Sequence, residues 1–104
     1  MRSNWEAAIE QLLDLYHWQW MHMRPAQTVR GWRTAASGCP GWPDYYAMRV
    51  ERSGEVRTLV IEAKGQRDKP TPDQQSWLDL FSLTDAEVYV WRPSDREEME
   101  KVLK

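Results

Sequence analysis

Two alternating segments, 45–50 and 56–63, constrain the fold more than any other part of the sequence. They are rich in valine, isoleucine and tyrosine and are separated by a glycine-containing turn, which predicts an antiparallel hairpin. Asp44 stands directly before the first strand, and Glu62 and Lys64 lie two positions apart in and just after the second. Alternate strand residues leave the same face, so the latter two side chains point the same way. Three charged groups beside an apolar hairpin are costly unless they bind a ligand, which predicts a metal-dependent site.

The elements predicted around this hairpin place it within a larger sheet. In chain order they are a helix over 3–16, a strand over 18–23, a breaker-rich loop over 24–42, a helix over 71–83 capped by Thr71, a strand over 87–91, and a last helix capped by Ser94 or Asp95. The order α-β-β-β-α-β-α predicts an α/β fold, in which helices flank a mixed central sheet. A chain of 104 residues is expected to form a single domain over 1–104.

The distribution of charge favours a polyanionic partner more than the net charge does. The formal net charge is −2, yet the segment from Arg24 to Lys69 carries nine basic and five acidic side chains. Such a basic middle suits a nucleic-acid backbone, although an ordinary solvated surface would have the same charge. The candidate DNA contacts lie in the two loops predicted around the hairpin: Arg24, Arg30, Arg33, Arg67 and Lys69. A simple ordered cover over the core is the competing interpretation of the longer loop.

A single cysteine suits a reducing compartment, and hydropathy bears on whether the chain is expected to enter a membrane. Cys39 is the only cysteine, which excludes an intrachain disulfide. The N-terminus lacks a signal-peptide layout, and no apolar run reaches the length of about 20 residues that spans a bilayer. We therefore expect a cytoplasmic protein without a membrane partner.

The residue types at the hairpin suit phosphodiester chemistry. Asp44 and Glu62 offer hard oxygen ligands for Mg²⁺ or Mn²⁺, and the backbone carbonyl of Ala63 can complete the protein's share of the inner shell. Lys64 can then orient the attacking water or stabilise negative charge on the phosphate. Taken alone this pattern is a weak signal, because acidic residues and lysines are common on strands.

The first helix offers two further carboxylates. On a helical projection Glu6 lies at the border of the apolar stripe, whereas Glu10 points further toward solvent. Glu6 could therefore lean into the site, or it could only close a capping box with Ser3. His22 is a further possible ligand or phosphate contact, although a packed or surface histidine is the more common outcome.

Several characteristic stretches follow one another along nearly the whole chain: His22-Met23-Arg24-Pro25-Ala26, Gly41-Trp42-Pro43-Asp44, Ile61-Glu62-Ala63-Lys64, the segment 71–78, and the segment 90–95. This wider pattern resembles the PD-(D/E)XK nuclease superfamily, and more specifically the small stand-alone VRR-NUC domains of phages and bacteria. The chain departs from the family pattern at Trp42, which intervenes between Gly41 and the Pro-Asp pair. The resemblance implies a restriction-endonuclease-like core.

The resemblance also implies roles for individual residues. Asp44 and Glu62 would ligate Mg²⁺ or Mn²⁺, Lys64 would be the catalytic lysine, and Gln74 would touch the site or substrate from the following helix. A glutamate of the first helix would join them, and its register favours Glu6 over Glu10 without deciding between them.

The implied activity is a metal-dependent DNA endonuclease that is structure-selective, similar to Holliday-junction resolvases or nickases. It would act on branched DNA as a homodimer, in a bacterial cell or a phage-infected host. The alternatives are a nuclease-like module that binds DNA or a protein without cleavage, and a structural protein whose tryptophans form an oligomer interface.

Overall fold

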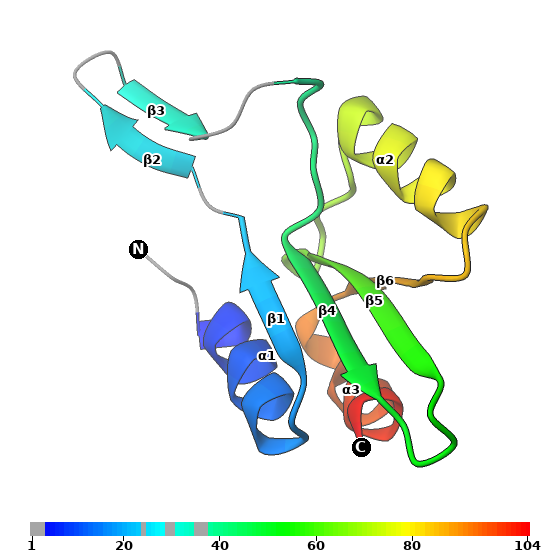
Figure 1. Ribbon diagram of the computed structural model, residues 1–104. Coiled ribbons are helices and arrows are strands. Elements are labelled where there is room, and N and C mark those ends of the chain that lie inside the picture. The colour runs from blue at the N-terminus through cyan, green and yellow to red at the C-terminus, as the bar shows by residue number, and fades with distance from the viewer. Residues whose placement is uncertain (1–3, 24, 29–30, 35–37) are drawn as a thin grey trace.

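The computed structural model describes residues 4–23, 25–28, 31–34 and 38–104, and it shows a mixed sheet as its centre. Among these residues, four strands pair in the order β1-β4-β5-β6. Their bounds are β1 Gln19–His22, β4 Tyr45–Val50, β5 Val56–Ala63 and β6 Glu87–Trp91. Strand β4 runs antiparallel to both β1 and β5, while β5 and β6 run parallel (Figure 1).

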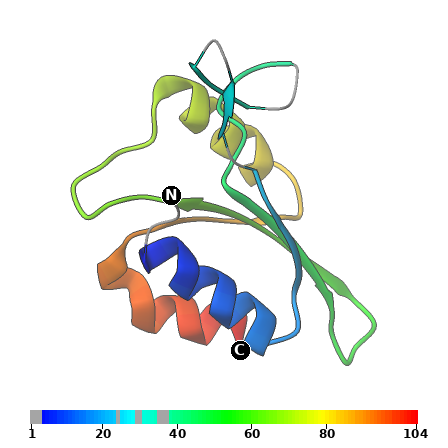
Figure 2. The ribbon, with the colours of Figure 1, turned by 90° about the vertical axis from the view of Figure 1, so that its left-hand side faces the viewer.

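Helices cover both faces of this sheet. Helix α1 (Asn4–Leu15) and helix α3 (Arg96–Leu103) lie on one face, and α2 (Pro72–Ser82) lies on the other (Figure 2). A short 3-10 turn, η1 (Pro93–Asp95), leads into α3. The predicted α/β class with a mixed, helix-flanked sheet is therefore confirmed. No helix in the described ranges is long and apolar enough to cross a membrane.

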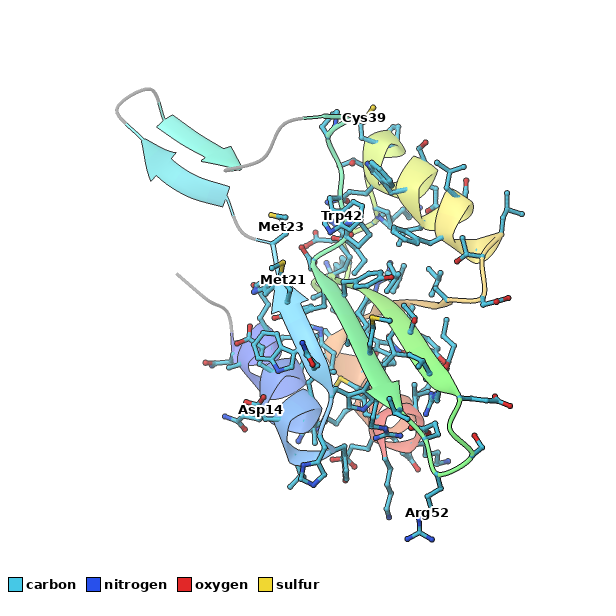
Figure 3. All side chains as sticks on the ribbon, viewed as in Figure 1. Asp14, Met21, Met23, Cys39, Trp42 and Arg52 are labelled. Carbon is cyan, nitrogen blue, oxygen red and sulfur yellow. The ribbon has the colours of Figure 1, made fainter. Side chains whose placement is uncertain are left out.

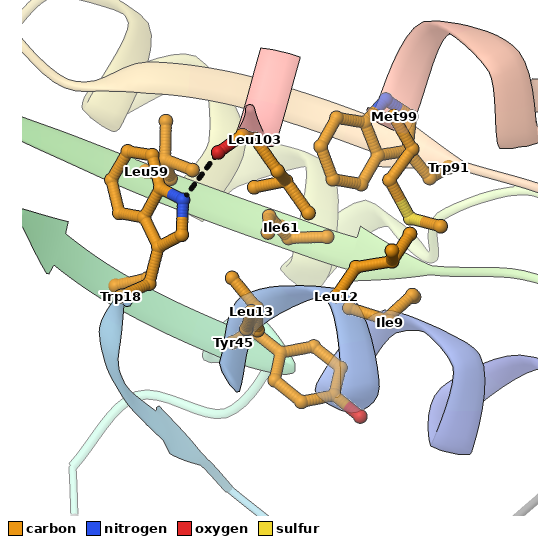
Figure 4. Close-up of a cluster of buried hydrophobic side chains, with 11 residues drawn as sticks. Ile9, Leu12, Leu13, Trp18, Tyr45, Leu59, Ile61, Trp91, Met99 and Leu103 are labelled. Atoms are coloured by element: carbon orange, nitrogen blue, oxygen red, sulfur yellow. Dashed lines mark hydrogen bonds between the residues drawn. The ribbon is translucent and has the colours of Figure 1, made fainter. Parts of the chain in front are cut away.

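The main core fills the space between the sheet and the pair α1 and α3. Odd-numbered residues of β5 face this core, as the strand alternation predicts. The fully buried members come from all of these elements: Ile9, Leu13, Tyr45, Leu59, Ile61, Trp91, Met99 and Leu103 (Figure 4). Each such side chain contributes about 1.5–3 kcal/mol by leaving water. Trp18 joins the same core, and its indole Nε1 donates to the Leu103 carbonyl over 2.9 Å.

The even-numbered residues of β5 face α2 instead. Val60 is fully buried there, and Leu78 of α2 is buried as well. Helix α2 begins at the predicted cap, because the Thr71 hydroxyl accepts from the Gln74 backbone N–H over 3.2 Å. The Gln74 side chain in turn accepts from the Thr71 N–H over 2.9 Å, which completes a capping box. The start of α2 is therefore fixed at the end of β5 that carries the charged residues.

The prediction of a continuous loop over 24–42 is wrong. Strands β2 (Pro25–Thr28) and β3 (Gly31–Thr34) pair as a separate antiparallel hairpin within this segment. Pro25 and Gly31 are the first residues of their strands, where a missing donor or side chain does little harm. The sequence interpretation treated both as loop markers and gave too little weight to the threonine and tryptophan around them.

Two arginines fix the C-terminus of α3 to the sheet. Arg49 of β4 donates from Nη1 to the Leu103 carbonyl over 2.8 Å and to the Tyr16 carbonyl over 2.9 Å. Arg57 of β5 donates to the Val102 carbonyl over 3.2 Å. Both guanidinium groups also lie over the Trp18 ring, at 4.3 and 5.1 Å from its centroid. Cations at this end of a helix satisfy its last carbonyls and oppose its dipole.

Arg49→Met is expected to lower the free energy of unfolding by about 1.5–3 kcal/mol, because it removes charge-assisted hydrogen bonds from partly buried carbonyls. The exposed Arg52, three residues along the same hairpin, provides the matched control Arg52→Met. Urea unfolding followed by circular dichroism measures both. Equal stability of the two variants would show that Arg49 contributes only as a surface cation.

Candidate active site

Asp44 is held at the entrance to β4 by hydrogen bonds to β5 and to the residue that follows β1. Its carboxylate Oδ2 accepts from the Ala63 backbone N–H over 2.8 Å, and its carbonyl accepts from the Met23 N–H over 2.9 Å. The side chain is therefore directed at the end of β5. The Pro43 that precedes it is fully buried, which gives the approach to β4 little freedom.

Glu62 is a buried carboxylate beside Asp44. Its residue is 1% exposed, and no donor among the described residues reaches its Oε2. Burial, together with the hydrogen bond and the charge of Asp44, raises the pKa of Glu62 to about 8, although the Lys64 charge opposes the shift. A buried carboxylate oxygen of this kind is costly unless a proton or a cation meets it.

Lys64 and Gln74 form the third side of the site. The Lys64 ammonium donates to Gln74 Oε1 over 2.7 Å and lies 3.9 Å from Glu62 Oε1. The same Gln74 oxygen is the acceptor of the capping box at Thr71. Gln74 therefore has two roles: it positions the Lys64 ammonium, and it closes the capping box at the start of α2. The Thr71 cap was predicted from the sequence but the capping box was not, although Thr-x-x-Gln is its signature.

A contact at Gly41, which the sequence did not predict, holds the loop that leads to Asp44 (residues 41–44, the Asp44 loop) against α2. Gly41 has φ +94°, and a Cβ there would lie 2.6 Å from the Asp73 carbonyl carbon and 2.8 Å from the Gln74 nitrogen. Only glycine allows this close approach in that backbone conformation. The loop that leads to Asp44 and the helix that carries Gln74 therefore touch backbone to backbone. A glycine before a Pro-Asp pair was the available signal.

The two glutamates of α1 lie together around His22, on the other face of the sheet. Glu6 Oε2 is 3.1 Å from His22 Nε2, and Glu10 Oε2 is 3.3 Å from Nδ1. The His22 ring stacks on Tyr45 at 4.1 Å, and the Tyr45 hydroxyl donates to Glu10 Oε2 over 2.6 Å. Burial, the hydrogen bond to Glu10 and the nearby carboxylates, Asp44 included, raise the pKa of Tyr45 above its usual range. Tyr45 therefore lies near two sets of carboxylates, Glu6 and Glu10 of α1 and Asp44 of the candidate site.

The prediction that Glu10 points toward solvent is wrong. Glu10 is 5% exposed, and it is the more buried of the two helix glutamates. The prediction from the helical projection assumed that the buried surface of α1 ends at its apolar stripe. His22 and Tyr45 extend that surface, because their polar atoms satisfy a carboxylate that would otherwise need water. In the described part of the chain, no three His, Cys, Asp or Glu side chains are grouped so as to hold a metal ion.

Comparison with known proteins identifies the family. The sequence profile of the VRR-NUC domain matches residues 2–95, nearly the whole chain. This chain belongs to the VRR-NUC family. Searches of curated proteins and of solved structures find no match. The sheet flanked by helices agrees with the VRR-NUC nuclease fold, and a nuclease-type domain implies DNA as its partner.

The VRR-NUC assignment also gives a reason to test the site for a divalent ion, which nucleases of this kind generally use. The residues fit such an ion: the Glu62 carboxylate is buried next to Asp44 and its Oε2 has no partner among the described residues, and oxygen donors are those that Mg²⁺ and Mn²⁺ prefer. Two carboxylates and the Ala63 carbonyl would leave the remaining positions to water and substrate.

The candidate DNA contacts of this VRR-NUC domain are distributed over two regions. Arg67 and Lys69 are exposed in the segment between β5 and α2, directly after Lys64. Arg33 belongs to β3, of which the structure describes the backbone pairing with Ala26. Arg24 and Arg30 lie outside the described residues. Their contribution to DNA binding therefore stays a prediction.

Proposed function

We propose that this VRR-NUC chain is a Mg²⁺- or Mn²⁺-dependent endonuclease that hydrolyses DNA phosphodiester bonds. The buried Glu62 carboxylate supports this most directly, because it adjoins Asp44, its Oε2 has no hydrogen-bond partner among the described residues, and its Oε1 lies 3.9 Å from the Lys64 ammonium. A purely structural site would gain stability by replacing these charges with apolar groups. Keeping them together is understandable where they bind a cation and a phosphate.

Each residue has a role in this proposal. Asp44, Glu62 and the Ala63 carbonyl would hold the ion, which when bound polarises the phosphate and lowers the pKa of a bound water. Lys64 stabilises the negative charge that develops on the phosphate oxygens. Gln74 fixes the lysine through its 2.7 Å hydrogen bond. Glu6 or Glu10 would act from the α1 side through the network at Tyr45.

We further propose that the substrate is branched DNA and that the protein acts as a homodimer, in the manner of Holliday-junction resolvases or of a structure-selective nickase. A dimer would place two sites on one junction. Apolar side chains left exposed on the sheet could serve the contact between copies: Met21, Met48, Val50 and Val56. Light scattering of the purified protein measures its mass in solution.

The decisive experiment is a cleavage assay on a panel of labelled DNAs. Four-way junctions, flaps, nicked duplexes and linear duplexes are each incubated with protein and Mg²⁺, Mn²⁺ or EDTA. If the proposal is correct, strand cleavage requires a divalent ion and is faster on a branched DNA than on a linear duplex. Binding of branched DNA without a nick in either metal would instead identify a non-catalytic binding module.

Gly41→Ala is expected to lower the cleavage rate by about 100-fold, because the new Cβ forces the Asp44 loop away from α2 and misplaces Asp44 relative to Lys64. Gly54→Ala is the matched control. Gly54 has a similar φ of +90°, but nothing lies within 4 Å of a Cβ built there. Both variants carry backbone strain, so melting temperatures should fall in both. Cleavage that falls equally in both would remove Gly41 from the positioning of the site.

A further inference from the structure

An exposed aromatic cluster stands directly beside the proposed active site. It consists of Trp42, Tyr46, Trp77 and Phe81, which come from the Asp44 loop, from β4 and from α2. Trp42 is its most exposed member, with 39% of its surface accessible. Figure 3 shows Trp42 between the start of β4 and α2. The four side chains are uncharged, so the cluster offers apolar and π surface next to an acidic site.

The geometry of the cluster holds Trp42 in one orientation. Its ring packs in edge-to-face geometry with two other rings, Trp77 at a centroid distance of 5.0 Å and an angle of 72°, and Phe81 at 5.4 Å and 79°. Trp77 is itself tied down, because its Nε1 donates to the Pro40 carbonyl over 3.0 Å. Edge-to-face packing of this kind stabilises aromatic pairs beyond their buried area. Trp42 is therefore both rigid and accessible, as a recognition residue needs to be.

The cluster is joined to the catalytic residues along two elements. Trp42 lies two residues before Asp44, a separation that an extended chain covers in about 7 Å. Trp77 lies three residues after Gln74, on a neighbouring position of the α2 surface. Gly41 fixes the start of the same loop against Asp73. A phosphate held by Lys64 and by an ion at Asp44 and Glu62 would thus have its own nucleotide, or the adjacent one, close to Trp42.

We propose that Trp42 stacks on an unpaired nucleobase next to the phosphate that Lys64 and an ion at Asp44 and Glu62 would hold. This inference rests on the proposed nuclease function and adds how branched DNA is selected. Every base has a π face, so stacking on a tryptophan does not depend on sequence. Bases within a duplex are already stacked on each other and cannot reach the ring. Branch points and single-stranded ends expose such bases, which favours these structures over intact duplex.

A binding experiment in EDTA separates stacking from cleavage. Fluorescence anisotropy measures the affinity of the full chain for a labelled flap DNA, with Trp42→Phe, Trp42→Leu and Trp42→Ala compared. Phenylalanine retains a π face, so its affinity should stay within about threefold of wild type. Leucine and alanine should each weaken binding on the order of tenfold. Trp20→Leu is the control, because Trp20 packs on the α1 side and donates to Asp14.

Equal affinities of Trp42→Phe and Trp42→Leu would overturn the proposal, since they would show that apolar bulk alone is needed. A Trp42→Leu variant that changes the mass of the protein in solution would identify the cluster as a contact between copies, which also overturns it. Melting curves of all variants are recorded first, so that a loss of fold is seen as such.

A second experiment uses the wild-type protein and therefore does not depend on any variant folding. An abasic residue is introduced at each position around the branch point in turn. One position should weaken binding of the wild type on the order of tenfold. Trp42→Leu should not respond to the same abasic residue, because its partner ring is already missing. If the abasic residue and Trp42→Leu weaken binding independently, so that their fold-losses in affinity multiply, the stacking contact is wrong.

The nuclease function and the stacking contact can be contradicted separately. If no DNA is cut in Mg²⁺ or Mn²⁺, the nuclease function is wrong, yet the response to the abasic residue in EDTA can still be present. If branched DNA is cut while the abasic residue has no effect at any position, the nuclease function stands and the stacking contact is wrong.

Discussion

Lys64→Met is expected to reduce the cleavage rate by about 100- to 1000-fold while leaving the fold unchanged. The ammonium lies 3.9 Å from Glu62 and is directed by Gln74, so it can meet charge that develops on a phosphate oxygen. Methionine has a similar length and no charge, and the lysine side chain is already partly exposed. Single-turnover cleavage of a branched DNA in Mn²⁺ measures the rate, and circular dichroism measures the fold.

The control for this variant is Lys101→Met, which removes one charge from the exposed surface of α3. Its cleavage rate should equal that of the wild type. Asp44→Ala and Glu62→Ala should lose cleavage as completely as Lys64→Met, since all three act on one phosphate. Activity that persists in any one of them would take that residue out of the catalytic group.

The sheet was predictable because its signals are local. Alternation in 45–50 and 56–63 determines which side chains face the core, and the turn between them leaves only the hairpin pairing. The Thr71 cap and Pro72 likewise mark the start of α2 within a few residues. The hairpin β2–β3 was missed for the same reason, because local breakers in 24–42 outweighed a pairing that depends on the partner strand.

The candidate site was only partly predictable, because some of its contacts join distant segments. Asp44, Glu62 and Lys64 follow from strand positions and from the resemblance. The contact of Gly41 with Asp73 joins residues 32 positions apart, and no periodicity reports it. Glu10 was misplaced because the projection of α1 contains no information about His22 and Tyr45. Buried polar networks depend on partners that only the tertiary structure brings together.

Glu62→Gln is expected to stabilise the metal-free protein while abolishing cleavage. Folding raises the pKa of Glu62 from its ordinary value of 4.5 to about 8, so between these values the folded state holds a proton that the unfolded state has released. The stability of the wild type in EDTA therefore falls as the pH rises from about 5 to about 8. Glutamine cannot ionise, and the variant should gain about 1–3 kcal/mol over wild type at pH 8.

Glu87→Gln is the control of opposite sign. The hydrogen bonds from Arg57 hold the pKa of Glu87 below its ordinary value, so this carboxylate stabilises the fold above its unfolded pKa and loses that contribution as the pH falls. Its amide variant should be less stable than wild type at pH 8. Urea unfolding between pH 5 and pH 8 measures both. A Glu62→Gln variant that is less stable at pH 8 would mean that a donor meets this carboxylate in solution.

Addition of Mn²⁺ completes the test, because it links the stability of the site to its function. A divalent ion that binds Asp44 and Glu62 only in the folded state should raise the melting temperature of the wild type at pH 8 in proportion to the logarithm of its concentration. Glu62→Gln should lose this response and Glu87→Gln should keep it, since Glu87 pairs with Arg57 at the far end of β6 from Trp91. An equal response in both variants would place the ion elsewhere. The burial of the Glu62 carboxylate would then need an explanation other than a metal ion.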